Sequence, residues 1–203
     1  MPIAYCLHGW IDLNIAVAGN VDSGKSTTIG VLTGGRLDDG RGRARTSIAK
    51  HPHERETGRT SYISHAYMGY DNNGNCLNDG IPSRKTSYAD VVKKSSKIIT
   101  FSDMAGHRKY LSTTIAGFSS AEADYAIIIV GLNRSITDLT IEHIGLCICF
   151  RIPFMILITK VDSKGKRHLV QDTLSHIKKL LRNLGVSKVP IVVKKNTPML
   201  DLA

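Results

Sequence analysis

Cysteine and long apolar runs are scarce in this chain of 203 residues, and each shortage excludes a class of protein. The four cysteines form no C-x-x-C pair and are too few for a disulfide framework, so a reducing, cytoplasmic compartment is the expected location. No apolar run approaches the roughly 20 residues of a membrane span. The start of the chain also lacks the basic and then apolar layout of a signal peptide. The sequence therefore predicts a protein with no membrane partner.

Aromatic and acidic residues are also few. Aromatic residues make up 6% of the chain, and 17 acidic residues against 27 basic ones leave a net charge of +10. The excess lies in three stretches, with net charges of +3 over residues 36–59, +4 over residues 84–97 and +8 over residues 160–195. These stretches are either ordinary solvated faces or a surface that binds a polyanion. Because no aromatic residues interleave with the lysines, the pattern lacks the stacking platforms typical of nucleic-acid binding.

The remaining composition is that of a folded α/β domain. Hydrophobic residues make up 42% of the chain, which excludes wholesale disorder. Short apolar runs alternate with stretches of helical periodicity, and this alternation predicts an α/β layer fold with a mostly parallel sheet. No repeat or composition shift marks a boundary, so we expect residues 1–203 to form a single domain. The predicted strands are residues 13–18, 62–70, 97–102, 124–130, 154–159 and 189–193, and the predicted helices are residues 26–33, 87–95, 139–150 and 170–184.

Two segments between these elements are expected to be irregular. Residues 36–60 show no periodicity, which predicts a long loop or short helical pieces, and such segments in compact domains are usually functional. Residues 71–75 combine Asp, Asn and Gly, which predicts a turn. This segment is not a calcium loop, because its glycine is misplaced and the twelfth position is Pro82.

A glycine-rich loop follows the first predicted strand. Gly19-Asn20-Val21-Asp22-Ser23-Gly24-Lys25-Ser26 matches the P-loop pattern G-x-x-x-x-G-K-[ST] in full, between a strand and a helix. In such a loop successive backbone N–H groups surround a phosphate chain, and the following helix presents its positive end. Lys25 would reach the β- and γ-phosphates, and the Ser26 hydroxyl would coordinate Mg²⁺. The match predicts a nucleoside-triphosphate site.

Two further motifs stand at the ends of later strands. Asp103-Met104-Ala105-Gly106 has the form D-x-x-G, and Thr159-Lys160-Val161-Asp162 has the form T-K-x-D. Each motif alone is a weak signal, because Asp103 and Asp162 could also cap the helices that follow. Their order after the P-loop and their placement at strand ends make the set specific.

Together these motifs resemble the GTP-binding domain of translational GTPases. Residues 20–27 and 103–107 look like elongation-factor versions of the first and third GTPase motifs. Residues 37–45, 56–61 and 94–101 are similar to one branch, the eukaryotic GTP-binding protein one and two family. The similarity runs from about Leu13 to Val193, and a copy from a large DNA virus (a giant virus) is our hypothesis for the source. The resemblance implies a P-loop NTPase fold of the Ras-like G-domain type, with one antiparallel strand and helices on both faces of the sheet.

The resemblance also implies a set of ligands and residue roles. It implies a protein that binds GTP and GDP, uses Mg²⁺, hydrolyses GTP to GDP and phosphate at a slow intrinsic rate, and acts as a switch. His107 would orient the attacking water, and Asp162 would accept hydrogen bonds from guanine while the stem of Lys160 lies against the base. The implied catalytic residues are His107, Lys25 and Thr60; the nucleotide-binding residues are Gly19, Asn20, Val21, Asp22, Ser23, Gly24, Lys25, Ser26, Thr27, Gly106, Thr159, Lys160 and Asp162; and the metal-binding residues are Ser26, Thr60 and Asp103.

Several positions leave alternatives open. Thr57 and Ser61 lie beside Thr60 and could replace it over the metal, and His107 could be an ordinary surface histidine. Arg59 stands where elongation factors carry an apolar residue, so it is either a tether or a cation that stabilises developing phosphate charge.

The sequence also departs from the family pattern near its end. Thr159 occupies the position where most GTPases have asparagine, which predicts a lower affinity for guanine. The fifth GTPase motif is missing after residues 189–193, and the chain leaves no room for the β-barrel domains of the family. We expect either an isolated G domain or a fragment.

Three function classes compete at this point. The first is a GTP-hydrolysing switch related to translation or RNA, and the second is a GTP- or GDP-binding scaffold that docks on a ribosome or RNA through its basic C-terminal third. The third, an ATP-using kinase, is disfavoured because Asp103 and Asp162 follow the P-loop in GTPase order. The sequence names no activating or exchange factor.

Overall fold

The computed structural model describes residues 11–45, 48, 63–78, 88–120, 122–161, 167–188 and 191. It divides into two compact units, residues 1–160 and residues 161–203, each of which is described here by itself. The predicted strand at residues 189–193 lies outside the described residues, apart from Ile191. Thr57, Arg59, Thr60, Ser61 and Asp162 also lie outside them.

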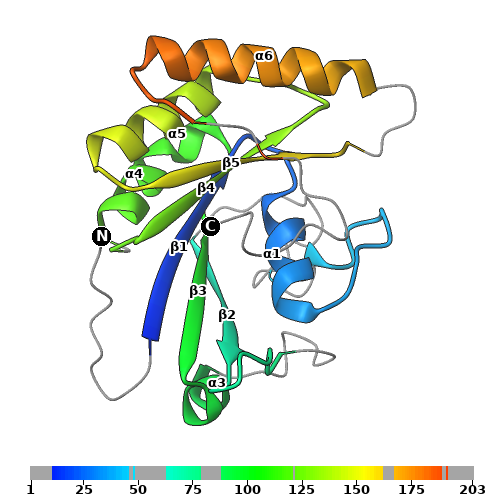
Figure 1. The fold of residues 1–203 in the computed structure, drawn as a ribbon, viewed down its shortest axis with the longest axis vertical. Helices are drawn as coiled ribbons and strands as arrows, with labels where there is room; N and C mark the ends of the chain where they lie inside the picture. Colours follow the sequence, from blue (N-terminus) through cyan, green and yellow to red (C-terminus); the bar gives the residue numbers. More distant parts are fainter. Residues whose placement is uncertain are drawn as a thin grey trace. The chain divides into compact units, whose positions relative to one another are not determined.

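A five-stranded sheet forms the centre of the first unit (Figure 1). The strands are β1 (Ile11–Gly19), β2 (Ser64–Tyr70), β3 (Lys97–Asp103), β4 (Tyr125–Gly131) and β5 (Phe154–Thr159). Their order is β2-β3-β1-β4-β5, in which β1 pairs in parallel with β3 and β4, β4 pairs in parallel with β5, and β2 runs antiparallel to β3. The predicted α/β fold, mostly parallel with one antiparallel strand, is therefore confirmed.

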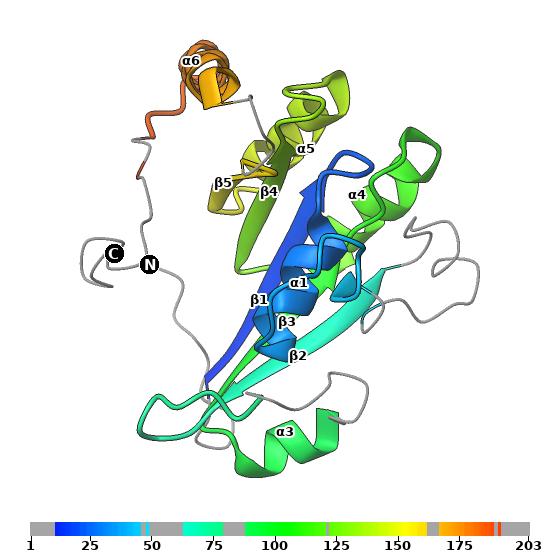
Figure 2. The same ribbon diagram turned by 90° about the vertical axis from the view of Figure 1, so that its right-hand side faces the viewer.

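Helices cover both faces of this sheet. Figures 1 and 2 show α1 on one side of the strands and α4 and α5 on the other. Among the described residues of the first unit, the helices are α1 (Lys25–Gly34), α3 (Tyr88–Lys94), α4 (Leu111–Ser120) and α5 (Asp138–Cys149), and a 3₁₀ turn, η2 (Arg108–Tyr110), precedes α4. The predicted helices at residues 26–33, 87–95 and 139–150 correspond to α1, α3 and α5. Helix α4 was not predicted.

The core follows the alternation of side chains along the central strands. Val17 on β1, Phe101 on β3 and Ile129 on β4 lie on the face that packs against Ile29 of α1. Their neighbours in sequence point to the opposite face, where α4 and α5 lie against β1. Because both faces are covered, the strands are almost continuously apolar, as expected of a parallel sheet.

The outer edge of β2 is capped by a turn. The Asp71 carboxylate accepts hydrogen bonds from the backbone N–H of Asn73 and of Asn75, so the turn predicted at residues 71–75 is confirmed. The chain then returns along β2 to Asn78, whose side chain is 1% exposed. Its Oδ1 accepts from the Gly69 N–H and its Nδ2 donates to the Tyr67 carbonyl, both at 2.9 Å. Asn78 therefore adds two hydrogen bonds at the outer edge of β2, which no described strand covers.

The second unit contains α6 (Arg167–Asn183), which corresponds to the predicted periodicity over residues 170–184. Ile177 and Leu181 are buried, whereas Lys178, Lys179 and Arg182 are exposed. The helix ends at Asn183, and Gly185, two residues later, has a φ of 70°, the left-handed conformation common after helices. Among the described residues, no helix combines the length and the apolar character needed to cross a bilayer.

Candidate functional site

The loop between β1 and α1 is shaped by two glycines with positive φ. A Cβ atom on Gly19 (φ 147°) would lie 2.3 Å from the Ile129 carbonyl oxygen of β4, so only glycine fits at the end of β1. Gly24 (φ 98°) is the left-handed N-cap of α1. Asp22 also has a positive φ, 59°, which Asp tolerates better than most residues. The loop therefore turns tightly into the N-terminus of α1, where backbone N–H groups lack helical partners.

Lys25 lies at the centre of the site. Its side chain is 6% exposed, and its Nζ donates to the Asn20 carbonyl at 3.0 Å. Burial lowers the pKa of this ammonium, while the nearby carboxylates of Asp103 and Asp22 act in the opposite direction. A Cβ atom on Gly106 would lie 2.3 Å from Nζ, which shows how closely the backbone after β3 approaches the lysine. Among the described residues, the Asn20 carbonyl is the hydrogen-bond partner of this buried ammonium, which is suited to receive an anion.

Ser26 and Asp103 form an oxygen pair beside Lys25. The Ser26 hydroxyl donates to Asp103 Oδ2 at 2.5 Å, and Asp103 is 1% exposed. Asp103 reaches this position because β3 pairs with β1 in parallel, with Val17 opposite Asp103, so that both strands end at the same edge. A hydroxyl and a carboxylate are hard oxygen ligands, and with phosphate oxygens they fit Mg²⁺. Within the described residues, no three His, Cys, Asp or Glu side chains are arranged to hold a metal by themselves.

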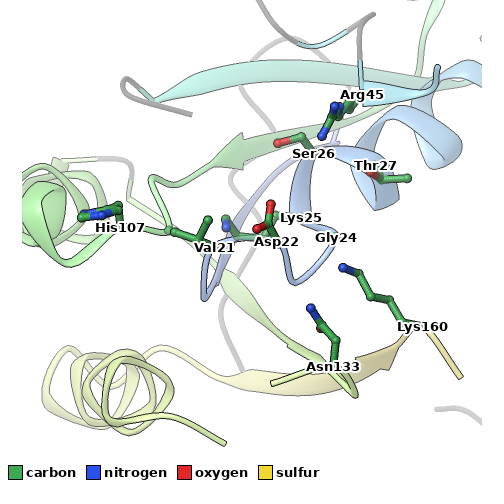
Figure 3. Close-up of a pocket in the computed structure, with 11 residues that line it drawn as sticks. Val21, Asp22, Gly24, Lys25, Ser26, Thr27, Arg45, His107, Asn133 and Lys160 are labelled. Carbon is green, nitrogen blue, oxygen red and sulfur yellow. The ribbon is translucent and has the colours of Figure 1, made fainter. Parts of the chain in front are cut away.

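His107 lies at the rim of the site and is exposed. Its Nδ1 accepts from the Lys109 N–H at 3.1 Å, which caps η2, and its ring meets Tyr110 edge-on with 6.2 Å between centroids. Figure 3 shows the imidazole directed away from Lys25 and Ser26. The structure thus brings the backbone of His107 to the site, while its ring is turned onto its own 3₁₀ turn.

The end of β5 is tied to the P-loop by a threonine. Thr159 Oγ1 donates to the Ser23 carbonyl at 2.5 Å. The adjacent Lys160 has a φ of 60°, and its side chain lies beside that of Asn133 (Figure 3). Asn133 follows β4, so the last strands of the sheet place a cation and an amide on the side of the P-loop opposite Arg45.

These residues surround one cavity of about 320 Å³. Most of its lining was predicted from the sequence, whereas Arg45 and Asn133 were not. Arg45 belongs to the basic excess at residues 36–59, which gave a partial signal, but Asn133 has no motif and is found only through the position of β4. The predicted residues that line the cavity are Val21, Asp22, Gly24, Lys25, Ser26, Thr27, Gly106, His107 and Lys160.

His143 on α5 is a buried titratable group that the motifs do not include. Its side chain is 0% exposed, and in the described structure neither ring nitrogen has a hydrogen-bond partner. Burial, assisted by the positive charge of Lys25, lowers the pKa of His143 to about 4. The ring is therefore neutral at pH 7.

The sequence profile of the Elongation factor Tu GTP binding domain matches residues 12–201. The chain belongs to this family. The G domain is 40% identical over 197 residues to GTP-binding protein 1 of Xenopus laevis, an alignment that covers 96% of this chain and 30% of the relative. It is 45% identical over 184 residues to GTP-binding protein 2 of Mus musculus, covering 91% of this chain and 30% of the relative. The predicted resemblance to translational GTPases of this branch is confirmed, and the chain spans 30% of the length of these two relatives.

Solved structures support the same fold. A bacterial selenocysteine-specific elongation factor, EF-Sec, superposes with a TM-score of 0.64 and 23% identity, over 88% of this chain and 25% of that one. The elongation factor SelB of Methanococcus maripaludis, in complex with the GTP analogue GppNHp, superposes with a TM-score of 0.55 and 22% identity, over 90% of this chain and 30% of that one. At such identity the likeness concerns the fold. The G domain is a GTP-binding domain of the translational GTPase type.

Proposed function

We propose that this G domain binds GTP with Mg²⁺ and hydrolyses it slowly to GDP and phosphate, as a switch in a process related to translation or RNA. The observation that carries the proposal is the buried Lys25 ammonium, which lies beside Gly106 and next to the Ser26–Asp103 oxygen pair. This arrangement provides a cation and metal ligands at one helix N-terminus, which are the parts that phosphoryl transfer requires.

Lys25, Ser26 and Asp103 have separate roles in this proposal. Lys25 holds the phosphate chain by charge, and burial strengthens that interaction because water does not screen it. Ser26 and Asp103 would hold Mg²⁺, together with Thr60. Neutralisation of phosphate charge is the chemistry that the metal supplies when bound.

Gly106 and Thr60 would sense the third phosphate through their backbone N–H groups. The segments around them would be ordered in the GTP state and released after hydrolysis. Rotation of the His107 ring away from the Lys109 N–H would let its Nε2 orient the attacking water. Catalysis would then consist of positioning and charge stabilisation.

Selection of guanine would rest on Asp162 and Lys160. The Asp162 carboxylate would accept hydrogen bonds from N1–H and the amino group of guanine, which adenine cannot donate. Thr159 supports this segment through its hydrogen bond to the Ser23 carbonyl. Asn133 lies next to Lys160 and adds an amide to the same part of the cavity.

Nucleotide binding and turnover by the purified protein test this proposal. We expect bound guanine nucleotide after purification, displacement of a fluorescent GDP by GTP but not by ATP, and GTP turnover above buffer that falls in His107→Ala. Asp162→Asn should shift preference toward xanthine nucleotides. Equal displacement by ATP would contradict guanine selection, and turnover that His107→Ala leaves unchanged would contradict the role of His107.

A binding module that docks on a ribosome or RNA is the second candidate. It is favoured by the exposed Lys178, Lys179 and Arg182 of α6. We expect salt-dependent RNA binding that is lost when all three are changed to Glu, while GDP affinity is retained. Absence of RNA binding even at low salt would exclude this candidate. A cytoplasmic location is part of both proposals.

A further inference from the structure

The segment before Arg45 is a loop built around two carboxylates. Asp38 accepts hydrogen bonds from the backbone N–H of Gly40, Gly42 and Ala44, at 3.0, 3.2 and 2.8 Å. The Asp39 carboxylate accepts hydrogen bonds from the backbone N–H groups of Arg41, at 2.9 Å, and Arg43, at 3.3 Å. The two side chains therefore fix alternate N–H groups of residues 40–44, and the loop is rigid because its own polar groups specify its path.

Two glycines fix the end of this loop. A Cβ atom on Gly30 of α1 would lie 2.2 Å from the Ala44 carbonyl oxygen, so the loop docks directly on the helix backbone. A Cβ atom on Gly42, which has a φ of 86°, would lie 2.6 Å from Arg45 Nε. The guanidinium of Arg45 thus rests on the bare Cα of Gly42. Its position is set by the loop and by α1 together.

Arg45 lines the same cavity as Lys25, Ser26 and Thr27. In the view of Figure 3, Arg45 and Lys160 approach the P-loop from opposite sides, with Arg45 on the side of Ser26. Among the described residues, the ion pair that forms is between Arg108 and Glu142, and no described carboxylate pairs with Arg45. A half-buried guanidinium, held in place and aimed into an anion site, is suited to bind phosphate oxygens in pairs.

We propose that Arg45 binds the phosphates of the nucleotide directly, from the side of Ser26, and that Asp38 is the positioning residue that holds it there. This inference rests on the proposed nucleotide site and adds to it a cation outside the three motifs. Because Arg45 lines the cavity together with Ser26 and Thr27, it contributes to binding of GDP as well as GTP.

Calorimetric titration with GDP, GTP and inorganic tripolyphosphate, each with Mg²⁺, tests the role of Arg45. We expect Arg45→Ala to raise the Kd for all three by about 10- to 100-fold, the effect of losing a hydrogen bond to a charged group. Arg45→Lys should recover part of the loss, because it keeps the charge without the paired donors. Arg41→Ala is the matched control, because this exposed arginine of the same loop does not line the cavity. The Kd of this variant for each of the three ligands should stay within about twofold of the native value.

The three ligands separate the two proposals. A Kd for GDP and GTP that Arg45→Ala leaves within about twofold, in a native protein that binds both, would overturn the role of Arg45 and leave the nucleotide site intact. Native protein that binds tripolyphosphate through Arg45, and binds GDP and GTP no more tightly than tripolyphosphate, would support the role of Arg45 and contradict recognition of guanine. Native protein that binds none of the three would overturn both.

A double-mutant cycle tests the role of Asp38. If Asp38 acts through Arg45, Asp38→Ala weakens GDP binding in the native background but adds nothing to Arg45→Ala. Additive losses would show that Asp38 acts by another route. Circular dichroism and urea unfolding of each variant establish that the comparison is between folded proteins, and Asp38→Asn, which keeps one acceptor oxygen, serves if Asp38→Ala does not fold.

Discussion

The ammonium group of Lys25 is buried, and burial disfavours its charged form. Because burial lowers its pKa, the ammonium form costs folding free energy, which Asp103 and Asp22 offset in part and a bound anion would offset further. We expect Lys25→Met to abolish nucleotide binding and yet to raise the free energy of unfolding of the nucleotide-free protein, on the order of 1 kcal/mol. Urea unfolding without nucleotide measures this. A variant less stable than the native protein would show that Lys25 is structural.

The lowered pKa of His143 leads to a second prediction about a single residue, namely how stability depends on pH. A pKa of about 4 in the folded protein lies below the ordinary value of 6.5, so the unfolded chain binds more protons between these two pH values. Stability contributed by the neutral ring is present above pH 6.5 and is lost as the pH falls toward 4. The difference amounts to at most about 3 kcal/mol.

Urea unfolding of native protein and of His143→Leu at pH 7.0, 5.5 and 4.5 checks this prediction. As the pH is lowered from 7.0 to 4.5, the free energy of unfolding of the native protein should fall more steeply than that of His143→Leu. Parallel curves for native protein and His143→Leu would contradict the assignment.

At the scale of elements, the edge of the sheet depends on Asn78. We expect Asn78→Ala to lower the free energy of unfolding by about 2 kcal/mol, because it removes a donor and an acceptor that β2 uses at Gly69 and Tyr67. Asn72→Ala, in the exposed turn of the same segment, should change it by less than about 0.5 kcal/mol. Urea unfolding measures both, and equal effects would contradict the capping role.

The link between β5 and the P-loop is a single hydroxyl. Thr159→Val keeps the shape of the side chain but removes its hydrogen bond to the Ser23 carbonyl. We expect a Kd for GDP about 5- to 10-fold higher, with a smaller effect on tripolyphosphate, because Thr159 steadies the side of the site assigned to the base. Competition titrations give both values. An equal loss for both ligands would place the effect in the phosphate-binding loop.

The strands and helices predicted from the sequence are those whose own residues show a clear apolar run or helical periodicity. Apolar runs marked the strands because both faces of this sheet are buried. Helix α4 was missed because Ser and Thr make up half of its residues, as in Ser112, Thr113 and Thr114, so its periodicity is weak. The helix is held instead by contacts with other parts of the fold, since the Thr114 hydroxyl donates to the Ala105 carbonyl and the Phe118 side chain is buried.

The candidate site was predictable to a similar degree. The P-loop and Gly106 lie in motifs whose spacing is local, so their positions could be read from the chain. Arg45 and Asn133 enter the cavity through a docked loop and the end of β4, which depend on the packing of α1 and on strand order. No pattern of neighbouring residues in the sequence encodes the packing of α1 or the order of the strands.

On the scale of the whole molecule, the nucleotide is expected to be part of the fold. With GDP and Mg²⁺ at about 100 times the Kd, the free energy of unfolding should rise by about 2.7 kcal/mol, because the unfolded chain has no site. Thermal unfolding should show this as a higher Tm that excess EDTA reduces, while ATP should have no effect. An equal rise with ATP would contradict guanine selection.

The net charge of +10 also has a clearer meaning in three dimensions. Lys25, Arg45 and Lys160 converge on one cavity, so part of the excess faces a predicted polyphosphate. Asp38 and Asp39 are used within the loop that carries Arg45. In the second unit, α6 carries the exposed cations Lys178, Lys179 and Arg182.

If Ser26 and Asp103 hold Mg²⁺ as proposed, the pairing of Val17 with Asp103 makes magnesium affinity a measure of how faithfully the sheet has folded. If β3 slipped by one residue along β1, the Asp103 side chain would turn to the other face of the sheet and move by about 3.3 Å. The apolar runs of both strands would tolerate such a slip better than the oxygen pair would. Misfolded molecules of this kind would keep their secondary structure and lose the metal. Titration with Mg²⁺ would therefore measure the fraction of molecules with the correct strand register, which circular dichroism does not distinguish.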